Sequence, residues 1–421
     1  MLPPLKLTHV IEKTVREEWG RILASLTKNL GDMQLAEDCL QEAVISAMNH
    51  WQKNGLPKSP PAWLIKVARR KAIDRLRRDQ NFASKQNEIS YLIELENQKN
   101  IEGERDVMQH VIPDKRLEMI FTCCHPALEE KTKIALTLRT LGGLSTQEIA
   151  NAFLDNPEAM AQRLVRAKKK IAIANIPYEI PDKQALPERL SSVLNVIYLI
   201  FNEGYSSNSG DSVTRADLSD EAIRLARIIK NLSPEETEIT GLLALMLLHD
   251  SRRQARTTSS GEKSGEMISL EDQNRERWDN AKISEGIKLI KAALPKQRLG
   301  PYQLQAAISA VHAEAKTWEQ TDWAQISALY NLLYAMQPSP VIRINQAMAV
   351  SYSQSLQAAL TMLMDANEAG KLDKYQPFHA AKADLLSRMG NTTQAKLSFK
   401  IAIKLSNNQQ EKDFLIQKIS H

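Results

Sequence analysis

The stretch Leu144–Ile171, LSTQEIANAFLDNPEAMAQRLVRAKKKI, predicts two helices separated by a tight turn. Ser145 and Glu148 have the spacing of a capping box, which begins a helix. Asn156 suits an N-cap, and Pro157 suits the first position of the second helix, where the missing proline N–H costs nothing. The stretch therefore predicts a helix-turn-helix, a unit that places its second helix in the major groove of DNA.

The second helix of this pair has one apolar face and one polar face. Met160, Leu164, Ala167 and Ile171 follow helical spacing and predict the buried stripe. The first turns of the polar face should reach base edges, and its basic end should meet phosphates. Two ordinary packed helices with a solvated basic face are the alternative. The residues expected at the DNA are Glu158, Ala159, Gln162, Arg163, Arg166, Lys169 and Lys170.

The composition indicates a helix-rich protein. Hydrophobic residues make up 43% of the 421 residues and aromatic residues only 5%, with few glycines and prolines. The length suggests about three domains. The longest apolar run, residues 241–248, is too short to cross a bilayer, and no signal peptide is evident. We therefore expect an all-α protein that is cytoplasmic and has no contact with a membrane.

The three cysteines, Cys39, Cys123 and Cys124, form no disulfide framework and suggest a reducing compartment. Cys124 precedes His125, but no second Cys/His pair is available to complete a tetrahedral metal site. We interpret the cysteines as small buried residues and expect neither a metal nor another cofactor.

Residues 9–80 read as packed helices. One helix is expected at about Leu35–Trp51, with Leu40, Val44, Met48 and Trp51 buried. Its other face is acidic and suits a basic partner surface. The residues expected at that partner are Glu37, Asp38, Gln41 and Glu42.

A third helix in this segment is strongly basic. From Trp63 to Gln80 it carries seven cations and two acids, a net charge equal to the +5 of the entire chain. Acidic residues are nearly absent from this helix, which indicates a nucleic-acid surface. A solvated helix face is the alternative. The residues expected at nucleic acid are Trp63, Lys66, Arg69, Arg70, Lys71, Arg75, Arg77 and Arg78.

The remaining chain divides into a linker and a helical extension. Residues 81–115 are polar and acidic, and predict a linker. Residues 181–421 contain further amphipathic helices, one of which we expect to be capped at Ser233 and to end near His249. Residues 317–406 are similar to tetratricopeptide hairpins, most clearly where Ala395, Phe399 and Ala402 follow Gly390.

Two charged clusters in the extension carry no recognisable chemistry. A catalytic site would need a convergent acid, base and nucleophile, and His312 has no evident partner in the sequence. We therefore expect no enzyme activity and predict a surface between domains or for a partner, with a solvated helix edge as the alternative. The residues assigned to this surface are Arg252, Arg253, Arg256, Arg275, Arg277 and Trp278.

Three motifs together resemble an extracytoplasmic-function, group four, RNA polymerase sigma factor. Residues 38–44, DCLQEAV, resemble the helix that binds the polymerase clamp helices. Residues 63–78 resemble the part that melts and reads the minus-ten element, and residues 148–167 the part that reads the minus-thirty-five element. Val44 stands where an aromatic residue is common, so a slightly weaker polymerase contact is expected. Ala159 stands where Ser or Thr is common, so one phosphate or base contact is expected to be missing and promoter preference does not carry over.

The resemblance implies a domain order and a function. It implies a polymerase-binding and minus-ten domain at 1–80, the linker at 81–115, a minus-thirty-five domain at 116–180 and a regulatory extension at 181–421. Residues 202–205, 300–307 and 338–341 match the subgroup whose extension is tetratricopeptide-like. The implied function is an alternative sigma factor that binds core RNA polymerase and directs promoter recognition, DNA melting and transcription initiation. A regulatory protein could bind the extension.

Two other classes of protein remain as alternatives. The first is a helix-turn-helix regulator with a helical sensor domain, which would act without replacing the sigma factor. Such a regulator would need neither the acidic helix nor the basic helix of residues 1–80. The second is an enzyme with a basic substrate site, for which the sequence offers no nucleotide loop, metal cluster or nucleophile.

Overall fold

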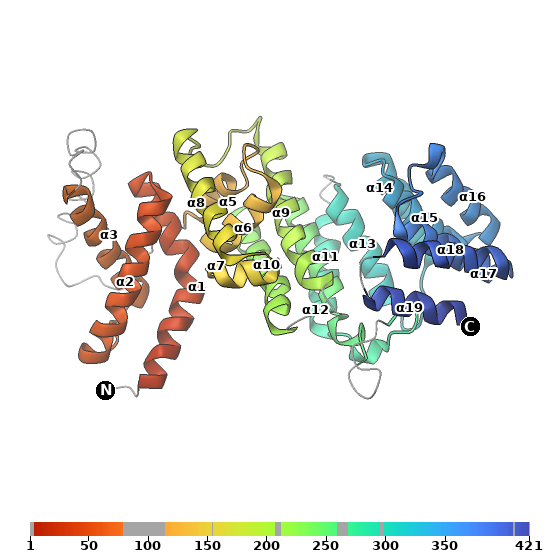
Figure 1. Cartoon of the computed structure of the whole chain (residues 1–421), viewed down its shortest axis with the longest axis horizontal. Coiled ribbons are helices and arrows are strands. Elements are labelled where there is room, and N and C mark those ends of the chain that lie inside the picture. The colour runs from red at the N-terminus through yellow and green to blue at the C-terminus, as the bar shows by residue number, and fades with distance from the viewer. Residues whose placement is uncertain are drawn as a thin grey trace. The chain divides into compact units, whose positions relative to one another are not determined.

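The computed structural model describes residues 4–78, 114–153, 155–206, 212–258, 268–294, 299–406 and 409–420. Every regular element in these ranges is a helix, which confirms the all-α prediction (Figure 1). The chain divides into two compact units, Met1–Glu203 and Gly204–His421. The predicted linker lies almost wholly outside the described residues.

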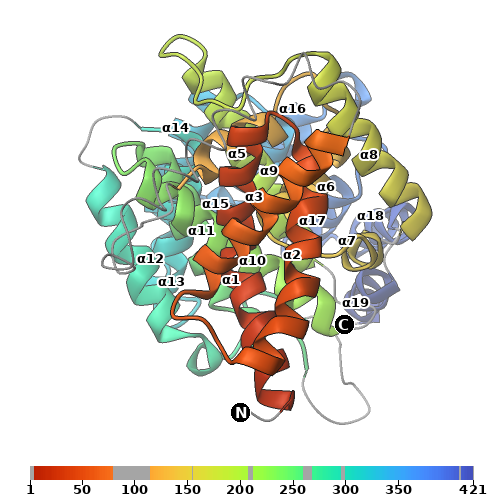
Figure 2. The same ribbon diagram turned by 90° about the vertical axis from the view of Figure 1, so that its left-hand side faces the viewer.

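The first unit begins with a bundle of α1 (Pro4–Leu30), α2 (Met33–Asn54) and α3 (Pro60–Arg78), which lie side by side in Figure 2. Gly31 has a φ of 67°, a left-handed conformation that ends α1 without strain. Asp32 then caps α2, because its Oδ1 accepts hydrogen bonds from the backbone N–H groups of Gln34 and Leu35 at 2.9 and 3.0 Å. Gly31 and Asp32 therefore separate α1 from α2.

The buried face of α2 differs in part from the prediction. Leu40 and Trp51 are buried as expected, but Met48 is 49% exposed and Val44 is only half-buried. Ala43 and Ala47 occupy the centre of the face instead. Because their side chains are small, α2 can approach α1 and α3 closely, which places the longer Met48 at the rim.

The helix-turn-helix prediction is confirmed in the next four helices, α5 (Arg116–Cys123), α6 (Glu130–Thr140), α7 (Thr146–Ala152) and α8 (Pro157–Ile173). Ser145 and Glu148 form the predicted capping box: the Ser145 Oγ accepts from the Glu148 N–H at 3.2 Å, and the Ser145 N–H donates to the Glu148 carboxylate at 2.6 Å. The Asn156 Oδ1 accepts from the first two N–H groups that follow Pro157, at 2.8 and 3.2 Å.

The cysteines are buried and free, as predicted. Burial raises the pKa of Cys39 to about 11 and that of Cys124 to about 12, so both thiols stay protonated at neutral pH. Cys123 lies 3.2 Å from the Thr140 hydroxyl. Within the described ranges there is no cluster of three metal-ligating side chains, and no helix is long and apolar enough to cross a membrane.

Helix α9 (Leu186–Ser206) carries the first unit beyond residue 180, where the sequence suggested a boundary. The Arg189 Nη2 donates to the Phe121 carbonyl at 2.6 Å, and the Ser192 Oγ donates to the Cys124 carbonyl at 3.1 Å. Residues up to Glu203 therefore belong with the helix-turn-helix region.

The second unit begins with α10 (Ser212–Leu232), α11 (Thr237–Asp250), α12 (Asn280–Ala293) and α13 (Pro301–Glu314). Helix α11 is buried on nearly every side. The Glu238 carboxylate accepts from the backbone N–H groups of Tyr302 and Gln303, both at 3.0 Å, and so satisfies the start of α13. The predicted cap at Ser233 is wrong: a turn follows Ser233, and Glu236 precedes α11 without a side-chain cap.

The unit continues with helical hairpins, visible as the blue end of the ribbon in Figure 1. Helices α15 and α17 begin at residues 340 and 376, and α16 and α18 at 356 and 392, so each pair has the same offset. Ala395, Phe399 and Ala402 are buried as the hairpin pattern predicts. The closer likeness to tetratricopeptide repeats stays a prediction. The helices are α14 (Trp323–Met336), α15 (Pro340–Ser353), α16 (Leu356–Ala366), α17 (Gln376–Arg388), α18 (Thr392–Leu405) and α19 (Gln409–Ser420).

Candidate nucleic-acid interface

Helix α8 presents the polar face that the sequence predicts. Its stripe of Met160, Leu164, Ala167 and Ile171 is buried against the rest of the unit. The residues on the opposite face are exposed, including all of the predicted DNA contacts except Arg163, which is half-buried. The orientation leaves the first turns of α8 open to a duplex.

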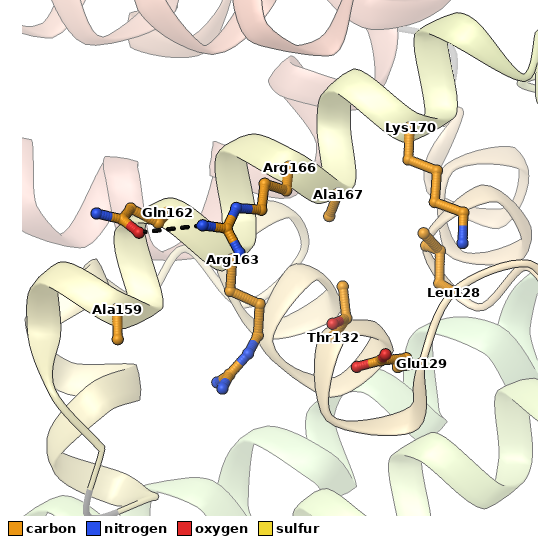
Figure 3. A pocket seen from close by; sticks show the side chains of 9 residues that line it. All are labelled: Leu128, Glu129, Thr132, Ala159, Gln162, Arg163, Arg166, Ala167 and Lys170. Carbon is orange, nitrogen blue, oxygen red and sulfur yellow. Dashed lines mark hydrogen bonds between the residues drawn. The ribbon is translucent and has the colours of Figure 1, made fainter.

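A depression of about 440 Å³ lies along this face (Figure 3). Arg163, Arg166 and Lys170 line it from α8, and Glu129 is the acid among the residues that line it. The Arg166 Nη2 donates to the Gln162 Oε1 at 3.3 Å, which holds both side chains at the rim. Arg163 instead pairs with Asp155 at 2.7 Å. The depression is thus a cationic surface suited to DNA phosphates and base edges.

Arg166 and Arg163 should therefore behave differently in DNA binding. We expect Arg166→Ala to cost about 1–3 kcal/mol of duplex affinity and to relax preference at one base position, because the exposed guanidinium can read a base edge. Arg163→Ala should cost less, since Asp155 already holds that side chain. Selection on randomised duplexes measures both effects, with Lys169→Ala as a control for a phosphate contact. An unchanged sequence preference in Arg166→Ala would show that Arg166 does not read bases.

The predicted DNA cations of α3 fall into two groups. Lys66, Arg70 and Arg77 are exposed. Lys71 and Arg75, in contrast, are ion-paired within the bundle. Arg69 is half-buried, and the side chain of Arg78 lies outside the described residues. The exposed group is the part of α3 that can meet DNA without breaking a contact.

The ion pairs of α3 involve acids that were predicted to bind a partner. Lys71 lies 3.2 Å from the Glu42 carboxylate, and Arg75 contacts both Glu42 and Asp38, the latter at 3.3 Å. All four side chains are partly exposed, so each pair contributes little, about 1 kcal/mol or less. A partner or DNA can therefore replace these contacts at small cost.

Trp63 lies at the start of α3 and is anchored against α2. Its ring packs edge-on against Trp51, with centroids 5.4 Å apart, and also contacts His50. The ring is half-buried. This packing fixes the indole while leaving part of it accessible as a platform for an unstacked base.

The sequence predicted that Glu37 lies on an exposed acidic face of α2. In the structure Glu37 is buried instead, and is only 3% exposed. The Arg139 Nε donates to its Oε1 at 2.6 Å, and Lys168 contacts its other oxygen. Lys168 also donates to the Gln34 Oε1 at 3.0 Å. Both cations belong to the helix-turn-helix region, which was predicted from the sequence to be a separate domain.

Further contacts join the same two regions around Glu37. A Cβ on Gly20 would lie 2.7 Å from the carbonyl oxygen of Leu141, so the α1 backbone here touches the end of α6 directly. The Arg139 guanidinium lies 5.7 Å from the centre of the Trp19 ring. We call this set of contacts the domain interface. It consists of Trp19, Gly20 and Glu37 on one side and Arg139, Leu141 and Lys168 on the other.

The structure also brings together the two charged clusters of the extension. Arg252 and Arg275 each lie over the Trp278 ring, at 5.9 and 4.8 Å from its centre. Trp278 is only 4% exposed, so the aromatic residue expected to anchor a surface is internal to the second unit. Arg253 pairs with Asp220 and Asp250. Arg256 packs over Tyr205, and Arg277 is exposed.

Comparison with known proteins matches three segments of the chain. Residues 15–82 match the family Sigma-70 region 2, and residues 118–171 match Sigma-70, region 4. Residues 189–294 match a family of unknown function, DUF6596. An uncharacterised protein of Rhizobium meliloti (strain 1021) is 41% identical over 399 residues, which cover 95% of this chain and 92% of the relative. No solved structure matches the chain.

Proposed function

Because this chain belongs to the sigma-70 family, with regions 2 and 4 and a DUF6596 extension, we propose that it is an alternative sigma factor controlled at two places. The domain interface holds regions 2 and 4 together before polymerase binds, and the extension regulates initiation. As a sigma factor, the chain binds RNA polymerase and recognises promoters. The finer assignments below are the proposal.

The proposed roles in initiation follow the exposed side chains of the two matched regions. In region 2, Asp38, Gln41 and Glu42 contact core polymerase, and the exposed cations of α3 bind the melted minus-ten strand. In region 4, the exposed face of α8 reads the minus-thirty-five duplex. A helix-turn-helix regulator that leaves the sigma factor in place would need no region 2, so the match to region 2 disfavours that alternative.

The observation that carries the closed arrangement is the burial of Glu37 between Arg139 and Lys168. Removing one partner from a buried ion pair commonly costs about 3–5 kcal/mol, because the remaining charge is left without compensation. In the closed arrangement Glu37 cannot contact polymerase. Separation of regions 2 and 4 exposes it, and a polymerase that binds the exposed acid favours the separated state.

The argument for regulation by the extension rests on α9. From residue 189 on, this helix belongs to the segment that matches DUF6596, yet Arg189 and Ser192 are hydrogen-bonded to region 4. Lys133 of α6 adds a contact to the Ser192 hydroxyl at 3.3 Å. Helix α9 is thus the part of the segment matching DUF6596 that contacts region 4, and the extension acts on region 4 through it in this proposal.

The test is transcription by core polymerase with the full chain and with residues 1–206, which keep α9 in place. We expect the fragment to bind duplex minus-thirty-five DNA as the full chain does but to initiate much more weakly, because the extension is required. Circular dichroism checks that the fragment remains helical. Equal transcript yield and equal promoter choice for a folded fragment would leave the extension without a regulatory role.

A further inference from the structure

The second unit contains a cavity that none of the sigma-factor roles uses. It has a volume of about 180 Å³ and lies between α11, α13 and the segment that ends in Trp278. Cavities for drug-sized ligands are commonly about 300–1,000 Å³, so this one suits a molecule of only a few heavy atoms. His249, Arg252, Trp278 and His312 are among the residues that line it.

Two buried polar groups at the cavity lack a partner among the described residues. They are the Nε1–H of Trp278 and the Nδ1 of His312. A buried donor without an acceptor costs about 1–3 kcal/mol, and folded proteins leave few such groups. The indole N–H can only donate, so the missing partner of Trp278 is a hydrogen-bond acceptor.

The charge on the described residues that line the cavity is positive. Arg252 lines the cavity, and the described residues that line it include no carboxylate. Burial, together with the charges of Arg252 and Arg275, lowers the pKa of His312 to about 4. Burial and the charges of Arg252 and Arg256 lower the pKa of His249 as well. Both imidazoles are therefore neutral at pH 7, and neither adds a compensating or competing charge.

Other arginines of the same unit show a different arrangement. Arg253 pairs with Asp220 and Asp250, and Arg227 pairs with Glu285. Arg252 instead donates to the Tyr205 hydroxyl at 3.2 Å and lies over the Trp278 ring. These neutral contacts hold the guanidinium in place and leave its charge uncompensated, as a binding site for an anion requires.

We propose that this cavity binds a small oxyanion, either a carboxylate or a phosphate group. Arg252 supplies the charge, the Trp278 indole donates one hydrogen bond, and the Nδ1-protonated tautomer of His312 donates another. Arg252 and Trp278 fall within the segment that matches the family of unknown function. The proposal concerns binding alone and does not depend on the sigma-factor assignments.

The test is a titration of the full chain followed through the indole N–H resonance of Trp278, which Trp278→Phe identifies. Acetate and inorganic phosphate are the two probes, and sodium chloride at equal ionic strength is the reference. We expect a saturable shift with one probe and none with chloride, and the stronger probe distinguishes a carboxylate from a phosphate site. If neither probe shifts the resonance, the cavity holds only water and the proposal is overturned.

Variants then test the assigned donors by calorimetry. Arg252→Gln should weaken binding of the active probe by roughly tenfold or more, because a charge-assisted bond is lost. Arg277→Gln removes a charge from the same segment outside the cavity and should bind as the parent does. Should Arg252→Gln not fold, Trp278→Phe retains a smaller aromatic ring without the N–H donor, and should bind severalfold more weakly. Unchanged affinity in the folded variant would refute the site.

Discussion

Replacing Arg139 and Lys168 together by alanine should open the domain interface and strengthen binding to core polymerase. The double variant leaves Glu37 without either cation, and a buried carboxylate in that state is several kcal/mol less stable than a paired one. Separation of regions 2 and 4 returns Glu37 to water, so the open state becomes the favoured one. Because less free energy is then spent on opening, we expect polymerase affinity to rise by about tenfold or more, or about 1.4 kcal/mol.

The measurement is an equilibrium titration of labelled chain with core polymerase. Arg163→Ala combined with Lys169→Ala is the matched control, because it removes two cations from the same helix-turn-helix region and leaves Glu37 paired. Thermal unfolding followed by circular dichroism shows whether the helices persist. Unchanged or weaker polymerase binding by a folded double variant would contradict a closed state held by Glu37.

Gly20→Ala should open the same interface without changing any charge. The added Cβ would lie 2.7 Å from the Leu141 carbonyl oxygen and 3.0 Å from its Cα, and neither backbone atom can rotate away. In the interior of a helix alanine is favoured over glycine by about 0.5–1 kcal/mol, so α1 itself should become more stable. The substitution should therefore destabilise the domain interface and stabilise α1.

Hydrogen exchange separates these two effects. We expect faster exchange at the end of α6 and in the first turns of α2, unchanged or slower exchange in α1, and tighter polymerase binding. Gly55→Ala is the comparison: its new Cβ meets no atom within 4 Å in the described structure, but the φ of 81° strains an alanine, so it should destabilise the end of α2 without faster exchange at the end of α6. If exchange around the interface is the same in Gly20→Ala and the parent, the close contact does not hold the regions together.

Much of the fold could be predicted from the sequence because its signals are local. The capping box at Ser145 and the cap at Asn156 involve residues two or three positions apart, and both form as expected. The buried stripe of α8 has the spacing of a single helix and is also correct. These signals involve only residues within one or two helical turns of each other. The rest of the fold therefore does not change what they predict.

The errors concern residues whose surroundings come from distant parts of the chain. Glu37 pairs with two cations that lie more than a hundred residues away in sequence. The helical pattern of α2 alone cannot predict this contact. One signal was present in α8: Lys168 lies between Leu164 and Ile171 on the buried stripe, where a cation needs an acidic partner. Trp278 is a second example: a Trp among arginines is typical of a surface anchor, but this indole is buried beneath the half-buried Arg252 and Arg275.

The most direct test of the account is transcription in vitro by core polymerase on a library of genomic fragments, with and without the full chain. The account predicts a discrete set of start sites that depend on the chain, with stronger initiation by Gly20→Ala at the same sites. If core polymerase initiates normally with its housekeeping sigma factor, but neither the parent nor Gly20→Ala directs any specific start, the chain does not act as a sigma factor.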